Sequence, residues 1–222
     1  MKVLYLLLIL VVVGTGCEKY NLKQPAYLGV NWRFASTSNS QGNYTITKGY
    51  FYSKEFSISG TREKGSPVEI TKSLPEPLQK IQFTTQSDLG ISLDVPMGDY
   101  TEFTLKALMD KTHNPCLRLE GTYTKGNLTY PMIIEWTNLD DLSFKVHNPF
   151  FLQKKKDYKI FIGFDVNQLL NISESFLQSP PFAMENGVET VVVRTNSGGS
   201  GGGQFYTAIT AQLPNALVLT VE

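Results

Sequence analysis

Apolar and polar residues alternate with a period of two along most of this chain. The longest run places Leu128, Tyr130, Met132, Ile134 and Trp136 on one side, with mainly polar or smaller residues between them. Successive side chains of a strand point to opposite faces, so such alternation predicts a half-buried strand. The same pattern recurs at Leu28–Phe34, Tyr50–Ile58, Ile91–Val95, Phe103–Met109, Leu117–Tyr123, Leu142–Val146 and Tyr158–Phe164.

Turn-forming residues separate these stripes. Val95-Pro96-Met97-Gly98 has Pro at the second position and Gly at the fourth, which is a type I turn pattern. It predicts a hairpin that joins two antiparallel strands, and Lys125-Gly126-Asn127 predicts another. Short strands with such turns favour a mostly β fold, an antiparallel β-sandwich that is Ig-like or transthyretin-like, with one or two short helices.

One short helix is expected after the strand that ends at Phe164. Asp165 can cap it, and Gln168 three residues later completes a capping-box pattern. Val166, Leu169 and Leu170 would be its apolar residues. A second helical turn is expected from Ser173 to Leu177, before Ser179-Pro180-Pro181 interrupts regular structure.

A glycine-rich stretch lies near the end of the chain. Residues 197–203 are only Ser and Gly, which predicts a flexible loop, and the apolar tail that follows predicts a buried final strand at Leu217–Val221. The loop is therefore expected to connect two elements of one domain. Ser200 lies in a Gly-x-Ser-x-Gly pattern, but glycine is a poor start for the helix that a nucleophile elbow requires.

The first seventeen residues differ from the rest of the chain. Met1-Lys2 precedes an unbroken apolar run from Val3 to Val13, and Gly14-Thr15-Gly16-Cys17 follows. A basic start, a short apolar run and small residues indicate a secretory signal peptide. The run is shorter than the roughly 20 residues of a membrane-spanning helix. We expect a signal at residues 1–16, a tether at 17–25 and a single β-sandwich domain at 26–222.

The end of this signal resembles the lipobox of bacterial lipoproteins. In that family the cysteine becomes the first mature residue and carries acyl chains such as palmitate, so the resemblance implies lipidation of Cys17. Gly14 departs from the usual Leu of the motif. Glu18, rather than Asp, follows the cysteine, which by the same resemblance implies the outer membrane, facing the periplasm or the cell surface. The alternative is an ordinary secretory signal in which Cys17 is incidental.

Composition limits the partners. The 222 residues are 41% hydrophobic and 12% aromatic, ample for a core. Basic and acidic residues number 20 each, and loss of Lys2 with the signal leaves 19 against 20. Such a balance provides no field to attract nucleic acid. The densest basic run, Lys154-Lys155-Lys156, is expected to be a solvated turn rather than a binding patch.

The residues that could carry chemistry are few. If Cys17 is lipidated, Cys116 has no internal disulfide partner, and its place before a strand favours a buried apolar role over a reactive thiol. The two histidines, His113 and His147, lack ligand spacing for zinc and both precede Ser200. We therefore expect no catalytic residues, metal or cofactor.

Carboxylates are scattered through the predicted turns. Calcium binding and glycoside hydrolysis both use such groups, but neither spacing is diagnostic, and we expect these residues to be turn formers and solvated charges. Asp94 and Asp99 flank one turn and would meet across its hairpin. The carboxylates in question are Asp88, Asp94, Asp99, Glu102, Asp140 and Asp141.

A second resemblance rests on the segment Val95-Pro96-Met97-Gly98-Asp99-Tyr100. With Leu119–Tyr123, Pro131–Glu135 and Tyr158–Asp165, it resembles an uncharacterised group of extracytoplasmic bacterial lipoproteins that carry a V-P-x-G-x-Y hairpin. The likeness spans residues 57–170. It implies a β-sandwich on a lipid anchor and brings no catalytic residues with it.

These observations favour a lipid-anchored envelope protein with a non-catalytic binding or scaffolding role, whose partners are the membrane and a glycan or protein ligand. One alternative is a carbohydrate-binding lipoprotein of a glycan-uptake system. Exposed Tyr or Trp on a sheet face would favour it, and burial of Trp32 and Trp136 would count against it. A second alternative is a pilus or adhesin subunit, which would leave an edge strand open for donor-strand pairing. An enzyme would need clustered carboxylates or histidines in one pocket.

Overall fold

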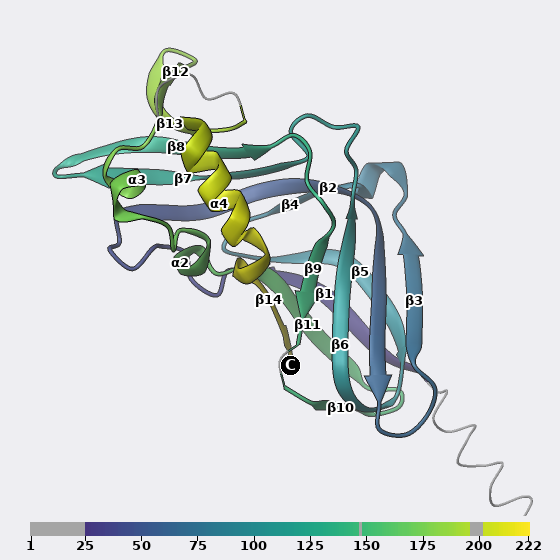
Figure 1. The fold of residues 1–222 in the computed structure, drawn as a ribbon. Coiled ribbons are helices and arrows are strands. Elements are labelled where there is room, and N and C mark those ends of the chain that lie inside the picture. The colour runs from purple at the N-terminus through teal and green to yellow at the C-terminus, as the bar shows by residue number, and fades with distance from the viewer. Residues whose placement is uncertain (1–24, 147, 196–201) are drawn as a thin grey trace, which may run out of the picture.

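Strands make up most of the computed structural model, which describes residues 25–146, 148–195 and 202–222 (Figure 1). The strands are β1 (Pro25–Arg33), β2 (Tyr44–Arg62), β3 (Val68–Ser73), β4 (Lys80–Phe83), β5 (Gln86–Pro96), β6 (Gly98–Met109), β7 (Leu117–Lys125), β8 (Leu128–Trp136), β9 (Leu142–Lys145), β10 (Phe150–Leu152), β11 (Asp157–Phe164), β12 (Phe182–Glu185), β13 (Val188–Val193) and β14 (Leu217–Val221). The helices are a 3₁₀ turn at Glu76–Leu78, α2 (Val166–Leu169), α3 (Glu174–Gln178) and α4 (Gly202–Ala216).

Two sheets pack face to face. The four-stranded sheet has the order β14-β11-β1-β5, and the larger sheet runs β10-β6-β2-β7-β8-β13-β12, with β3, β4 and β9 joined to its long strands. Most neighbours are antiparallel, but β1 pairs with β11 and β8 with β13 in parallel. The predicted mostly β sandwich is confirmed.

The predicted stripes supply the core between the sheets. Leu28, Val30 and Trp32 of β1 are fully buried, as are Leu105 and Ala107 of β6. They belong to one hydrophobic cluster that draws residues from both sheets and all three α-helices. The core therefore comes from the alternation that the sequence shows, because each strand turns one face inward.

The stripe of β2 does not follow the predicted pattern. Phe56 and Ile58 point into the core, but Phe51 does so in place of Tyr50 and Tyr52, which are only half-buried. The register of β2 shifts between Ile46 and Lys48 against β7, and again between Ser53 and Glu55 against β6. A bulge adds one residue to a strand and so reverses which side chains face inward. The prediction of one apolar face from Tyr50 to Ile58 was wrong for this reason.

The turn at Pro96-Met97-Gly98 is also different from the prediction. It links β5 of the four-stranded sheet to β6 of the larger sheet, so it forms a corner between sheets and not a hairpin. The hydroxyl of Tyr100 donates to the Pro96 carbonyl at 2.6 Å, and Arg62 donates to the Met97 carbonyl at 2.8 Å. Burial raises the pKa of Tyr100 to about 12, despite the nearby Arg62. The hairpin predicted at Gly126, between β7 and β8, is confirmed.

Both expected helices are present. The Asp165 carboxylate accepts from the amides of Asn167 and Gln168, as the capping pattern predicted for α2. The 15-residue α4 was missed, and the expected glycine loop at 197–203 extends too far, because Gly202 and Gly203 lie in the first turn of this helix. Its buried residues Phe205, Ile209 and Leu213 recur every four positions, which is the signal that would have revealed it.

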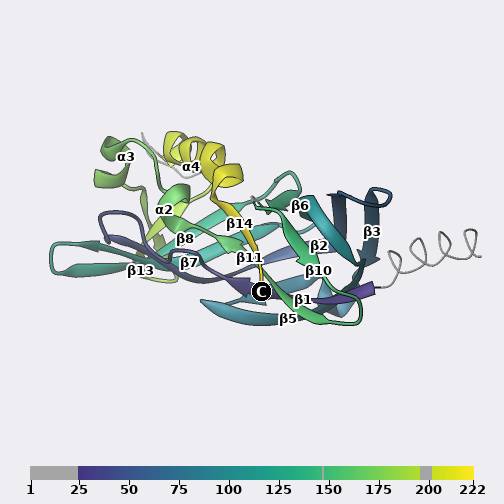
Figure 2. The ribbon, with the colours of Figure 1, turned by 90° about the horizontal axis from the view of Figure 1, so that it is seen from below.

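The helices cover only part of the sandwich. They lie together at one end, beside β13 and β8, and leave β1 and β5 uncovered on their outer side (Figure 2). The sequence from Met1 to Gln24, including Cys17 and the predicted signal and most of the tether, is outside the described residues. So are His147 and Ser200.

Candidate binding surfaces

A large hollow among the described residues lies where α4 ends and β14 begins, and we call it the α4 cleft. It has a volume of about 800 Å³. Its apolar part consists of the nearly buried Leu139, Leu142, Leu213 and Leu217. Polar groups complete the wall: Asn138, Asp140, Asp141, Ser143, Lys145, Thr210 and Asn215. Apolar side chains that can bury a ligand, together with polar groups that can orient it, are the two components of a ligand site.

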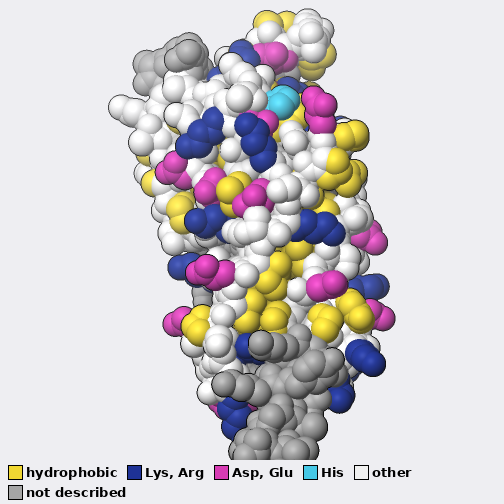
Figure 3. Space-filling model, turned by 90° about the vertical axis from the view of Figure 1, so that its right-hand side faces the viewer, with side chains coloured by type: hydrophobic (Ala, Val, Ile, Leu, Met, Phe, Trp, Pro, Cys, Tyr) yellow, Lys and Arg dark blue, Asp and Glu magenta, His cyan; other side chains and the backbone are white. Residues whose placement is uncertain are grey.

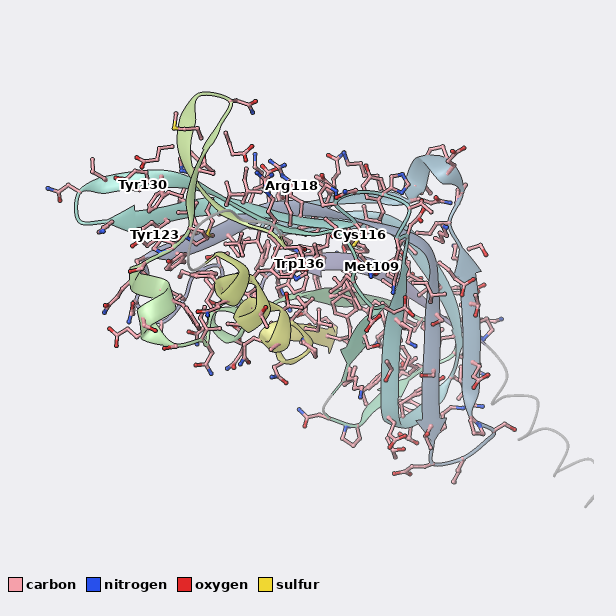
Figure 4. All side chains as sticks on the ribbon, turned by 45° about the horizontal axis from the view of Figure 1, so that its top comes forward. Met109, Cys116, Arg118, Tyr123, Tyr130 and Trp136 are labelled. Atoms are coloured by element: carbon pink, nitrogen blue, oxygen red, sulfur yellow. The ribbon has the colours of Figure 1, made fainter. Side chains whose placement is uncertain are left out.

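The helix reaches this position through its contact with β8. The indole nitrogen of Trp136 donates to the Thr210 hydroxyl at 2.9 Å, and Trp136 points toward α4 while Arg118 on β7 points the other way (Figure 4). Pro214 lies one turn beyond Thr210 and has no N–H to donate to the Thr210 carbonyl. Both residues line the cleft.

The two carboxylates of the cleft have different surroundings. Asp141 accepts from the Met109 amide at 3.1 Å and so fastens the β8–β9 loop to the end of β6. Asp140 is fully exposed and contacts Lys111 at 3.2 Å. The structure therefore explains Asp141 as a turn former, as its spacing suggested, and leaves Asp140 accessible at the rim.

A second hollow lies on the outer face of the four-stranded sheet, and we call it the Tyr27 groove. Its volume is about 490 Å³. Gly29 forms its floor between Ser92 of β5 and Lys159 of β11, and Tyr27, 38% exposed, stands at one end. Asn31, Asp88, Asp157, Tyr158 and Glu222 complete its lining. A tyrosine beside amide, hydroxyl and charged groups can recognise a polyhydroxylated ligand.

The outer face of the larger sheet carries an ion-pair network instead. Arg118 contacts Glu120 at 2.7 Å and Glu135 at 2.8 Å, and Arg194 joins Glu135 to Glu185. These groups come from β7, β8, β12 and the end of β13, so the network ties neighbouring strands together. A smaller hollow of about 280 Å³ beside Tyr50 and Glu120 adjoins it.

His113 belongs to a structural cluster. Its ring stacks on Tyr52 at 3.8 Å between centroids, and Nδ1 lies 3.2 Å from an oxygen of the buried Asp110. Burial alone would raise the pKa of Asp110, but hydrogen bonds from Thr112 and Lys54 lower it from 3.8 to about 2. The contacts favour the structural role over zinc ligation.

Cys116 lies in the core. Its thiol is fully buried and donates to the Trp136 carbonyl at 3.2 Å, and burial raises the pKa of the thiol. A protonated, inaccessible thiol is not a nucleophile. This placement agrees with the predicted apolar role.

The predicted meeting of Asp94 and Asp99 does not occur, because the hairpin between them does not form. Asp94 pairs with Tyr27 across β1 and β5, whereas Asp99 pairs with Phe151 across β6 and β10. Each carboxylate therefore lies on a different sheet.

The pilus or adhesin alternative requires an edge strand that is open to a donor strand, and β5 is the edge strand of the four-stranded sheet. Apolar side chains gather in a stripe on the face over β3 (Figure 3), and Ile70 and Leu89 are among the partly buried apolar residues of β3 and β5. Lys72 of β3 donates to the Ser92 carbonyl at 2.6 Å, and Gly90 has a φ of 66° at a register shift of β5. A lysine and a bulge are common ways to block pairing at an edge.

Within the described ranges, no three His, Cys, Asp or Glu residues are placed to hold a metal ion. Among the same residues, no helix has the length and apolar character needed to cross a bilayer. No protein-family model, curated protein or solved structure matches the chain. The fold alone therefore describes the protein: it is a β-sandwich of mixed strand orientation with a cleft at the end of α4.

Proposed function

We propose that this protein is a lipid-anchored binding protein of the cell envelope, held in the outer membrane through Cys17 and without catalytic activity of its own. One geometric observation carries the proposal: Pro25, the last residue of the predicted tether, and the α4 cleft lie at opposite ends of the four-stranded sheet. The chain enters β1 at Pro25, whereas Leu217 of the cleft pairs with Phe164, beyond the other end of β1. Nine residues of strand separate these ends by about 25–30 Å.

This arrangement suits a protein that is anchored at one end and presents a ligand site at the other. The apolar and polar groups of the cleft support binding. Asp110, Asp141 and His113 are engaged in structural contacts, which supports a role in binding over one in catalysis.

Cell fractionation with mass spectrometry tests the anchor. The native protein is expected in the membrane fraction with a mass raised by acyl chains on Cys17, and Cys17→Ser should release it. Ser200→Ala is the matched control and should change neither result. A Cys17→Ser protein that stays wholly in the membrane fraction, with its mass unaltered, would contradict the anchoring.

The second candidate function is carbohydrate binding, which the exposed Tyr27 favours. The C–H edges of a pyranose ring form an apolar surface that packs on an aromatic ring, and Asn31, Ser92 and Lys159 would meet its hydroxyls. The burial of Trp32 and Trp136 counts against it, because neither ring is accessible to a sugar.

Calorimetric titration with cellohexaose, xylohexaose and maltohexaose tests this candidate. If one of them binds, Tyr27→Ala should weaken the affinity at least tenfold, while Leu128→Ala, which removes an exposed side chain on another strand, should leave it unchanged. No binding of any of the three sugars, or equal affinity in both variants, argues against a glycan site in the Tyr27 groove.

A further inference from the structure

The turn between β10 and β11 carries three consecutive lysines at the surface. Lys154, Lys155 and Lys156 are all exposed, and Lys155 has a φ of 55°, in the left-handed region. None of the three forms a salt bridge with a described carboxylate. Lys156 instead lies over the ring of Tyr158, 5.3 Å from its centroid. Their positive charge is therefore available to an external partner, and we call these three residues the basic turn.

Backbone hydrogen bonds fix the basic turn to the first described residue. The Lys155 amide donates to the Pro25 carbonyl at 2.8 Å, and the Tyr27 amide donates to the Lys156 carbonyl at 3.0 Å. In the sequence, residues 18–24 are all that separates Cys17 from Pro25. The eight residue steps from Cys17 to Pro25 span at most about 29 Å. An acylated Cys17 thus keeps the basic turn within that distance of the bilayer.

An exposed aromatic side chain lies beside the turn. Phe151 in β10 is 46% exposed, although its neighbour Leu152 is fully buried. β10 pairs with the beginning of β6, next to the corner at Pro96. Exposed phenylalanine together with lysine is typical of surfaces that rest in the headgroup region of a membrane.

We propose that the basic turn and Phe151 contact anionic phospholipid headgroups of the membrane that carries the anchor. This inference rests on the proposed lipid anchor. Each lysine near an anionic surface contributes about a fivefold gain in affinity. Asp99 and Asp157 are exposed nearby and oppose part of this gain, but three lysines outnumber them. The contact would orient the domain with the α4 cleft directed away from the bilayer.

Vesicle flotation tests this surface without the acyl chain. The Cys17→Ser protein is mixed with vesicles of phosphatidylethanolamine alone or with a quarter of phosphatidylglycerol. We expect binding only to the anionic vesicles, lost in 0.5 M NaCl because salt screens the charges. Replacing all three lysines of the turn by Gln should weaken it about 100-fold, whereas Asp99→Asn should strengthen it.

A triple Lys→Gln variant at Lys48, Lys111 and Lys125 is the matched control, since it makes the same change in net charge on other strands and loops. It should bind like the Cys17→Ser parent, and circular dichroism should show that both triple variants remain folded. Equal loss of binding in both triple variants, or binding that does not depend on phosphatidylglycerol, would overturn the proposal.

A labelling experiment separates this inference from the anchor itself. In the membrane-bound protein, a membrane-impermeant maleimide should modify Lys155→Cys much more slowly than Lys125→Cys. Equal rates in an acylated protein refute the contact and leave the anchor intact. Conversely, a native protein without acyl chains whose basic turn still binds anionic vesicles refutes the anchor and leaves the contact standing.

Discussion

The two tryptophans of this protein are both fully buried, yet their surroundings differ. Trp32 lies between the sheets, stacked on Phe83 with 3.7 Å between centroids and edge-on to Phe34 and Phe164. No described atom accepts a hydrogen bond from its indole nitrogen. Trp136 lies under α4, and its nitrogen donates to Thr210.

This difference distinguishes two ways of joining elements. The contact between sheets depends on aromatic packing, which needs volume and shape but few directional bonds. The contact between α4 and β8 combines packing with one directional hydrogen bond, which selects the helix position that forms the cleft. We therefore expect the sheet contact to be sensitive to lost volume and the helix contact to be sensitive also to lost polarity.

The largest effect is expected from Trp32→Ala. It removes the ring at the centre of the aromatic cluster and should reduce the free energy of unfolding by about 3–5 kcal/mol. Urea unfolding followed by circular dichroism measures it. Leu128→Ala, at a side chain that is 61% exposed, is the control and should change stability by less than about 0.5 kcal/mol. Similar losses at both sites would mean that the aromatic cluster is not the core of the sandwich.

Leu105→Ala extends the test to β6 in the other sheet. Leu105 is fully buried, so the change should cost about 2–5 kcal/mol, whereas Thr104→Ala on the opposite face should cost well under that. Denaturant melts of the two variants check the facing of this strand. Equal and small losses in the two variants would show that Leu105 does not face the core.

At acid pH, the protein should lose the stability that the ionised Asp110 carboxylate contributes at the end of β6. The pKa of Asp110 is lowered in the folded protein to about 2, so its contribution is present above its unfolded pKa of 3.8 and is lost as the pH falls toward 2. Stability should therefore decline over this range by about 1–2 kcal/mol more in the parent protein than in Asp110→Asn. Parallel stability profiles for the two proteins from pH 5 to pH 2 would disprove the role of Asp110.

The smallest expected effect is the difference in stability between Trp→Phe substitutions at the two tryptophans. Trp136→Phe loses a hydrogen bond as well as volume, while Trp32→Phe removes an indole N–H that has no described acceptor. Trp136→Phe should therefore cost about 1 kcal/mol more than Trp32→Phe, and Thr210→Val should cost about the same amount by itself. If both Trp→Phe variants lose equal stability and Thr210→Val loses none, the hydrogen bond to α4 contributes nothing.

The candidate sites were much less predictable than the fold. The sequence predicted only Asp140 and Asp141 of the α4 cleft, and only Asp88 of the Tyr27 groove, as residues that could carry chemistry, whereas other lining residues such as Leu142 and Tyr158 were predicted only as strand residues. The cleft combines a loop after β8 with the end of a helix some 70 positions later, and the groove combines β1, β5 and β11. A local sequence pattern cannot show which segments far apart in the chain lie together. The helix itself was missed because the glycines at its start are typical of a loop.

The sequence by itself determined where most of the long strands lie and which face of most of them is apolar, as in Phe103–Met109, because these properties depend on side chains two residues apart. It also determined the cap at Asp165, where acceptor and donors are neighbours. Only the tertiary structure decided that the chain at Pro96 crosses between sheets, that β1 runs parallel to β11, and that bulges in β2 turn Tyr50 outward. These features depend on which distant strand lies alongside, and therefore on the packing of the whole core.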